Sequence, residues 1–74
     1  MRISKFSPID RAYPVFEVWD DKGDTLYFEV MASDDGVAQI AFHESLTHPL
    51  FSLSEFSRAL RDAELMMAEA LNSN

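Results

Sequence analysis

The segment from residue 25 to residue 31 alternates regularly between two kinds of side chain. Leu26, Phe28 and Val30 occupy every second position, with Tyr27 and Glu29 between them. A period of two is typical of a β-strand that has one face on the core. The pattern predicts a central strand whose core face carries the three apolar residues.

Two flanking segments continue this alternation and are joined to the central strand by similar turns. Residues 13–20 lead into the turn 20–24, and residues 37–43 follow the turn 33–37. Both turns have glycine as the third residue of a three-residue loop, which is typical of a type I turn closed by a bulge with glycine in the left-handed conformation. We therefore expect an antiparallel meander whose strands end near residues 20, 32 and 43.

The turns also predict how the strands are aligned. If the residues that bracket the first turn pair, Val18 lies opposite Leu26 and Phe16 lies opposite Phe28. The corresponding pairing across the second turn places Phe28 opposite Phe42. The alignment predicts a row of three phenylalanines at the centre of the core.

The ends of the chain carry two further elements. Residues 2–6 are compatible with a short edge strand that Pro8 would end, although their alternation does not assign a face. A helix is predicted from Leu53 to Leu71, because Ser52 and Glu55 have the spacing of a capping box. Phe51 and Phe56 have the spacing of a hydrophobic staple. Apolar residues recur at helical spacing within this segment: Leu53, Phe56, Leu60, Ala63, Met67, Ala70 and Leu71.

These elements predict an α+β fold in a single domain, residues 1–74. An antiparallel meander of three to four strands would be covered on one face by a single C-terminal helix. A bare sheet of this size must bury its apolar face, and the helix is the other amphipathic element in the chain.

Composition narrows the range of partners. The net charge is −7, and residues 12–51 carry Lys22 against eight carboxylates. The negative electrostatic field of such a chain disfavours binding to nucleic acid, because proteins bind phosphates through Lys and Arg. The field favours a basic partner, or it serves solubility alone. The absence of cysteine excludes disulfides and thiolate metal sites. No apolar run approaches the roughly 20 residues that span a bilayer, so we expect a soluble, cytoplasmic protein that does not bind membranes.

Candidate catalytic and metal-binding groups are few. His43 and His48 are the two imidazoles, and neither has the companions of a zinc site. On the face away from the helix, Tyr27 would lie between Glu17 and His43, with Glu29 diagonal to Glu17. That arrangement would sit on an open sheet face where nothing excludes water, and acid-base catalysis needs a substrate held in a cleft. We expect no enzyme activity, no metal and no cofactor.

The same outer face is rich in large side chains: Tyr13, Val15, Trp19, Tyr27, Met31 and Val37. Either a partner covers them, or residues 1–6 or the loop 44–50 fold over them. Tryptophan and tyrosine anchor many interfaces, and interleaved carboxylates would give the face one sign of charge and select a basic partner. The predicted partner-binding residues are Trp19, Tyr27, Glu17, Glu29, Asp20 and Asp35.

Three short segments and the capped helix carry a resemblance to known proteins. Phe16-Glu17-Val18-Trp19-Asp20, Asp35-Gly36 and Ala41-Phe42-His43 resemble small acidic bacterial orphan proteins that are taken to be immunity proteins. Tyr13-Pro14 and Ser54-Glu55 are similar to the HicB type of antitoxin, but the proline- and glycine-containing segment that follows the last strand in that family is missing. The immunity resemblance therefore ranks first, and it implies inhibition of a toxin.

We therefore expect a non-enzymatic protein-binding module, an inhibitor or immunity protein for a basic partner such as a toxin or nuclease. A homo-oligomeric structural or regulatory module, such as a homodimer, is the alternative. A phage-type acidic mimic of nucleic acid is a third.

Overall fold

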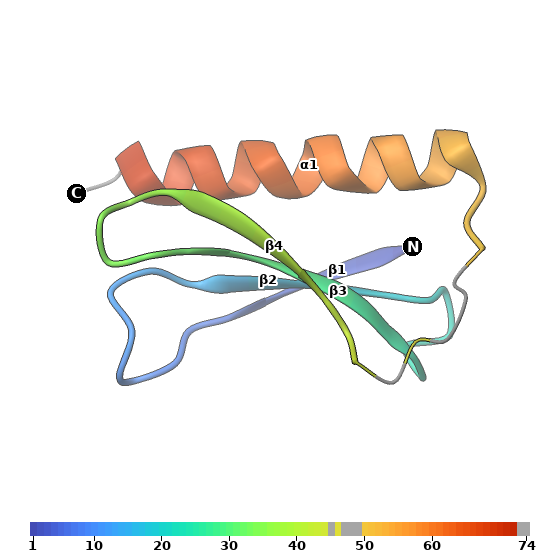
Figure 1. The fold of residues 1–74 in the computed structure, drawn as a ribbon, viewed down its shortest axis with the longest axis horizontal. Helices are drawn as coiled ribbons and strands as arrows, with labels where there is room; N and C mark the ends of the chain where they lie inside the picture. Colours follow the sequence, from blue (N-terminus) through green and yellow to red (C-terminus); the bar gives the residue numbers. More distant parts are fainter. Residues whose placement is uncertain (45, 47–49, 73–74) are drawn as a thin grey trace.

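In the computed structural model, which describes residues 1–44, 46 and 50–72, a four-stranded sheet and one helix form two layers (Figure 1). The elements are β1 (Arg2–Phe6), β2 (Val15–Trp19), β3 (Leu26–Ala32), β4 (Ala38–Phe42) and α1 (Leu53–Asn72). The strands are antiparallel and lie in chain order, β1-β2-β3-β4. The predicted α+β meander with one C-terminal helix is confirmed, and residues 2–6 form its first edge strand.

The second hairpin has the predicted register. Phe28 pairs with Phe42, and the Ser33 N–H donates to the Val37 carbonyl at 3.0 Å. Gly36 closes the turn with φ of 82°, the left-handed conformation that glycine adopts without strain. The turn chemistry therefore fixed this alignment.

The first hairpin differs from the prediction by two residues. Val18 pairs with Phe28 instead of Leu26, and Phe16 pairs with Val30 instead of Phe28. The ladder shifts between Val18 and Trp19, where β3 carries an extra residue. Because the displacement is even at Phe16 and Val18, these residues stay on the core face with Phe28 and Val30. The prediction is wrong for Leu26, which pairs with Trp19 beyond the shift and does not belong to the core.

The side chain of Asp20 accounts for the first residue of this displacement, at the turn, and the extra residue in β3 accounts for the second. One of the Asp20 carboxylate oxygens accepts the N–H of Asp24 at 2.7 Å and the N–H of Thr25 at 3.1 Å. The Asp20 N–H donates to the Thr25 carbonyl at 2.9 Å, so the pairing closes one residue later than a three-residue loop would allow. Gly23 keeps the expected positive φ of 78°.

The core lies between the sheet and α1. Its buried residues are Phe16, Val18, Phe28, Val30, Ala59, Ala63 and Met67. The aromatic cluster consists of Phe28, Phe42 and Phe56, with the Phe28 ring 5.6 Å from Phe42 and 5.4 Å from Phe56 between centroids. Phe16 is in the core but does not lie opposite Phe28, so the predicted phenylalanine row is wrong at that position.

The start of α1 follows the sequence prediction. The Glu55 N–H donates to the Ser52 hydroxyl oxygen at 3.5 Å, and the Phe56 N–H donates to the Ser52 carbonyl at 2.9 Å. The rings of Phe51 and Phe56 stack with centroids 5.5 Å apart. Ser52 is therefore the N-cap, and the two phenylalanines form the staple.

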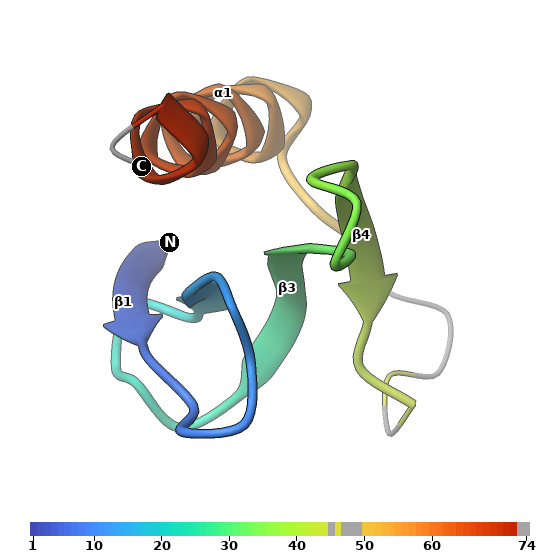
Figure 2. The ribbon, with the colours of Figure 1, turned by 90° about the vertical axis from the view of Figure 1, so that its left-hand side faces the viewer.

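The helix covers β1, β2 and β3, whereas β4 lies beside it (Figure 2). Four strands at a spacing of about 4.8 Å are wider than a helix of about 10 Å, and α1 packs over the three strands β1 to β3. Every residue of β4 is exposed. Ile40 and Phe42, which belong to the core face of the sheet, remain 42% and 52% accessible.

Candidate functional site

The face of the sheet opposite α1 carries side chains from three strands. Arg2 pairs with Trp19, Ser4 pairs with Glu17, and Glu17 pairs with Glu29. Both chain neighbours of Glu17 are core residues, so Glu17 and its paired residues point away from the helix. We call this group, Arg2, Ser4, Glu17, Trp19 and Glu29, the outer face.

Glu17 and Glu29 are direct partners across the β2–β3 ladder. The sequence predicted them as diagonal neighbours, and the register shift brings them closer. Side chains directly opposite in an antiparallel pair have Cβ atoms about 5 Å apart, and like charges there are destabilising. Within residues 1–44, 46 and 50–72, neither carboxylate has an ion-pair partner.

Trp19 is half-buried at one end of the outer face. It lines a shallow hollow of about 290 Å³ with Arg2, Ser4, Lys22 and Gly23. The expectation that the whole face carries one sign of charge is therefore wrong at this end. The pairing of β1 with β2 brings Arg2 beside Trp19, and the weak alternation of residues 2–6 did not reveal that pairing.

Asp20 follows Trp19 but has a role within the turn. Its carboxylate accepts the two backbone N–H groups described above, and these bonds, chiefly that from Thr25, hold the pKa of Asp20 below its usual value of 3.8. Asp35 is exposed in the β3–β4 turn, at the opposite end of β3 from Trp19. The structure therefore does not bring Asp35 together with the outer face.

Tyr27 does not take its predicted place beside Trp19. It is the residue in β3 that the bulge leaves without a partner in β2. Its ring packs against the core cluster and meets Phe51 edge to face, with centroids 4.9 Å apart. The prediction assumed strict alternation through β3, and the bulge breaks that alternation at Tyr27.

The chain itself covers part of the face opposite the helix. Val15, predicted to be an outer residue, is only 4% accessible, and the Arg11 guanidinium donates to the Met31 sulfur at 3.5 Å. The residue that contacts Met31 on this face, Arg11, belongs to the segment 7–14. Residues 1–6 form β1 at the sheet edge instead, and most of the loop 44–50 lies outside the described residues.

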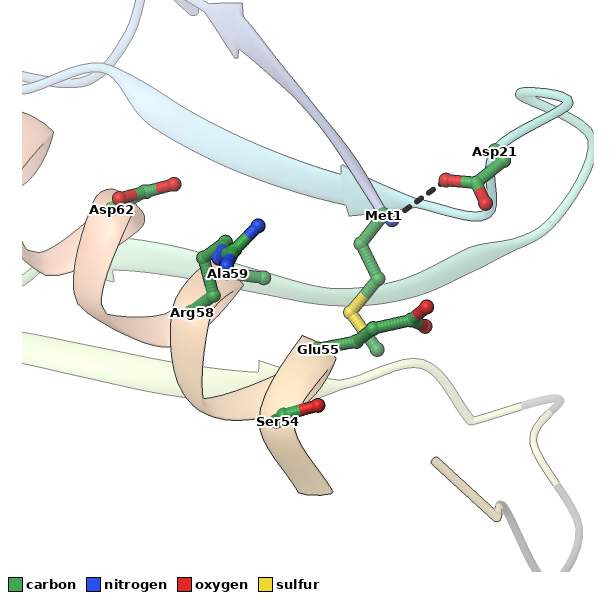
Figure 3. Close-up of a pocket in the computed structure, with 7 residues that line it drawn as sticks. All are labelled: Met1, Asp21, Ser54, Glu55, Arg58, Ala59 and Asp62. Atoms are coloured by element: carbon green, nitrogen blue, oxygen red, sulfur yellow. Dashed lines mark hydrogen bonds and ion pairs between the residues drawn. The ribbon is translucent and has the colours of Figure 1, made fainter. Parts of the chain in front are cut away.

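A polar hollow of about 280 Å³ lies on the helix side (Figure 3). At its edge the Met1 amine lies 2.7 Å from an Asp21 carboxylate oxygen. Its lining residues are Met1, Asp21, Ser54, Glu55, Arg58, Ala59 and Asp62. These include no histidine, the side chain that most often acts as the general base for a serine hydroxyl.

The described part of the chain gives no support for a metal site or a membrane-spanning helix. There, no three His, Cys, Asp or Glu side chains are grouped to hold a metal ion, and His48 lies outside it. No helix in that part is long and apolar enough to cross a membrane.

Comparison with protein-family models, with curated proteins and with solved structures found no match to this chain. The resemblance to immunity proteins and to HicB-type antitoxins stays a prediction.

Sequence reasoning missed a second surface, the open side of the core beside β4. Its exposed apolar residues include Ile40 and Phe42, both in β4. The signal was present in the width of the fold, because four strands at a spacing of about 4.8 Å are wider than one helix of about 10 Å.

Proposed function

We propose that this chain is a non-enzymatic protein-binding module whose outer face binds a basic protein, in the manner of an inhibitor or immunity protein for a toxin or nuclease. The observation that carries the proposal is the direct Glu17–Glu29 pair. Such a pair costs the isolated fold roughly 0.2 to 1 kcal/mol. A lysine or arginine from a partner would turn this repulsion into attraction.

Trp19 supports the same location. Its half-buried ring adjoins the acidic pair along β2, and tryptophan is among the residues that most often dominate binding energy. Arg2 and Lys22 beside it limit where a cationic group can approach. The basic groups of the partner therefore meet Glu17 and Glu29, while Trp19 packs against a neutral part of the interface.

The charge of the chain favours fast capture of such a partner. A net charge of −7 attracts a cationic protein over a Debye length, which is about 8 Å at physiological salt. Association should therefore be fastest at low ionic strength and slow as salt is added.

Affinity purification from the native host, followed by mass spectrometry, tests the proposal. The tagged wild type should capture a basic protein that a Glu17→Gln/Glu29→Gln variant does not. The control, Asp62→Asn/Glu69→Gln, removes the same charge from the exposed side of α1 and should retain the partner. With the partner identified, Trp19→Ala should weaken binding by about 2 kcal/mol.

The fold of each variant is verified by circular dichroism. Equal capture by the outer-face variant and the control would contradict the proposal. Capture of no basic protein by the wild type would contradict it as well.

A further inference from the structure

An apolar groove runs between β4 and α1 on the helix side of the sheet. It contains a hollow of about 180 Å³ lined by Val30, Ala38, Gln39, Ile40, Leu60 and Glu64. Farther along β4, the Phe42 ring stacks on Phe56 of α1, with centroids 6.4 Å apart. Figure 2 shows β4 standing clear of the helix on this side.

The backbone of β4 offers an unpaired edge next to this groove. The Val37 carbonyl accepts the N–H of Ser33, the residue after β3, and the His43 N–H donates to the Tyr27 carbonyl in β3. Along a strand, the backbone N–H and C=O groups of successive residues point to opposite sides. Those of Ala38, Ile40 and Phe42 therefore point away from β3. Among the described residues, β3 is the one strand that pairs with β4.

This edge lacks the features that keep edge strands apart. Between Ala38 and Phe42 there is no charged residue, no proline and no bulge. Natural proteins use such features to prevent pairing between edges. An edge without them, beside exposed apolar side chains, is built to pair with another strand.

We infer that β4 pairs with β4 of a second copy of this chain, antiparallel and about a twofold axis at Ile40. This register opposes Ile40 to Ile40 and Ala38 to Phe42, and it overlaps the two strands completely. All three residues have outward-pointing backbone groups, so each pair exchanges both N–H···O bonds. A large ring then faces a small side chain, and the two isoleucines extend the apolar core across the axis.

Charge favours a second copy over a basic partner at this edge. Among the four described strands, β4 alone carries no charged residue, in a chain of net charge −7. Pairing through β4 therefore places no like charges opposite each other within the strands. A cationic protein would find its attraction at the outer face, on the other side of the sheet.

The accessible area fits an interface of this kind. The chain exposes 5431 Å², whereas a monomer of its mass, 8.4 kDa, is expected to expose roughly 4600 Å². The excess of about 800 Å² is summed over the whole chain, and each partner of a standard interface buries about that area. Dimerisation goes beyond the proposed function and does not depend on it, because the outer face remains free.

Analytical ultracentrifugation of the wild type over a range of concentrations tests the inference. We expect a reversible dimer of about twice 8.4 kDa that tightens as salt screens the repulsion between two acidic chains. Ile40→Lys should weaken the dimer at least about tenfold, since it removes apolar contact and opposes two cations across the axis. Leu65→Lys, at a site that is 57% exposed on α1, is the control and should leave the dimer intact.

Cysteine cross-linking decides the matter if Ile40→Lys fails to fold. The chain has no cysteine, and directly paired strand residues have Cα atoms about 5.5 Å apart, within reach of a disulfide. Ile40→Cys should oxidise to a covalent dimer at concentrations where Leu65→Cys stays monomeric. A wild type that is monomeric at all concentrations and salts, or equal cross-linking of the two variants, would overturn the inference.

Discussion

The Tyr27 ring meets the Phe51 ring edge to face, with centroids 4.9 Å apart and an interplanar angle of 65°. Tyr27 belongs to the bulged start of β3, and Phe51 precedes the N-cap of α1. Phe51 in turn stacks on Phe56 in the first turns of the helix. The bulge therefore directs one aromatic side chain of the sheet toward the beginning of the helix and couples the two layers there.

Tyr27→Ala is expected to destabilise the fold. The substitution removes the edge-to-face contact, worth roughly 0.5 to 1.5 kcal/mol, together with part of the apolar burial, so we expect a loss of about 1 to 3 kcal/mol. Tyr27→Phe keeps the ring and should lose much less. Urea denaturation measures both, and an unchanged Tyr27→Ala protein would place Tyr27 on the outer face after all.

Phe28→Ala is expected to be among the most damaging substitutions. Phe28 is fully buried, and it contacts Phe42 and Phe56. Truncation of a central core phenylalanine costs about 3 to 5 kcal/mol. Phe42→Ala, in the same aromatic cluster but 52% exposed, should cost clearly less, and thermal melts that rank the two variants the other way would argue against this core.

Gly36 should resist substitution because of its backbone conformation. A Cβ at this position would meet the Leu71 Cδ2 and the Tyr13 hydroxyl at 3.8 Å, which is ordinary contact. The cost of Gly36→Ala therefore comes from φ of 82° and should be about 1 to 2 kcal/mol. Gly36→Asn should lose less, since asparagine tolerates this conformation, and equal melting temperatures for the two variants would rule out backbone strain as the cause.

The two hairpins show how far the sequence could be interpreted. Their turns have similar residues, yet the register was predicted correctly for one and wrongly for the other. In the second turn, the Ser33 hydroxyl accepts the Val37 N–H at 3.2 Å and the pairing continues directly. In the first, the longer carboxylate of Asp20 accepts two N–H groups, and an extra residue enters β3. Competition between side-chain and backbone hydrogen bonds caused the difference in register between the two hairpins. The alternation of apolar and polar residues carries no information about that competition.

The candidate site was predicted less well than the fold. Glu17, Trp19 and Glu29 lie on one face because period-two alternation survives an even shift in register. Tyr27 was misplaced because alternation fails at a bulge, and Arg2 was missed because a β1–β2 connection without a clear turn motif gives no register. The fold class is determined by many residues together, whereas the position of each site residue is determined by one local feature, such as a bulge or a turn.

Acid should weaken the first turn through Asp20. Backbone N–H groups, chiefly that of Thr25, hold the pKa of Asp20 below its usual value of 3.8 in the folded chain. A carboxylate of this kind contributes stability above its unfolded pKa, and the contribution disappears as pH falls through the lower folded value. Asp20→Asn should therefore be less stable than the wild type at neutral pH, and the difference should shrink in strong acid. Asp34→Asn makes the same charge change in the other turn, and a similar pH trend in that control would contradict the role of Asp20.

Glu17→Gln and Glu29→Gln should each stabilise the isolated protein. Each substitution removes one charge from two carboxylates that are direct partners across β2 and β3, which should raise the free energy of unfolding by a few tenths of a kcal/mol up to about 1 kcal/mol. The gain should be largest at low salt and decrease at high salt, because the repulsion it relieves is screened at this open face. Because one neutral partner already ends the repulsion, the double variant should gain less than the sum of the single ones. Urea denaturation at low and high salt measures all three variants. If either single substitution destabilises the chain at low salt, the two carboxylates stabilise the fold, and their pairing does not indicate a basic partner.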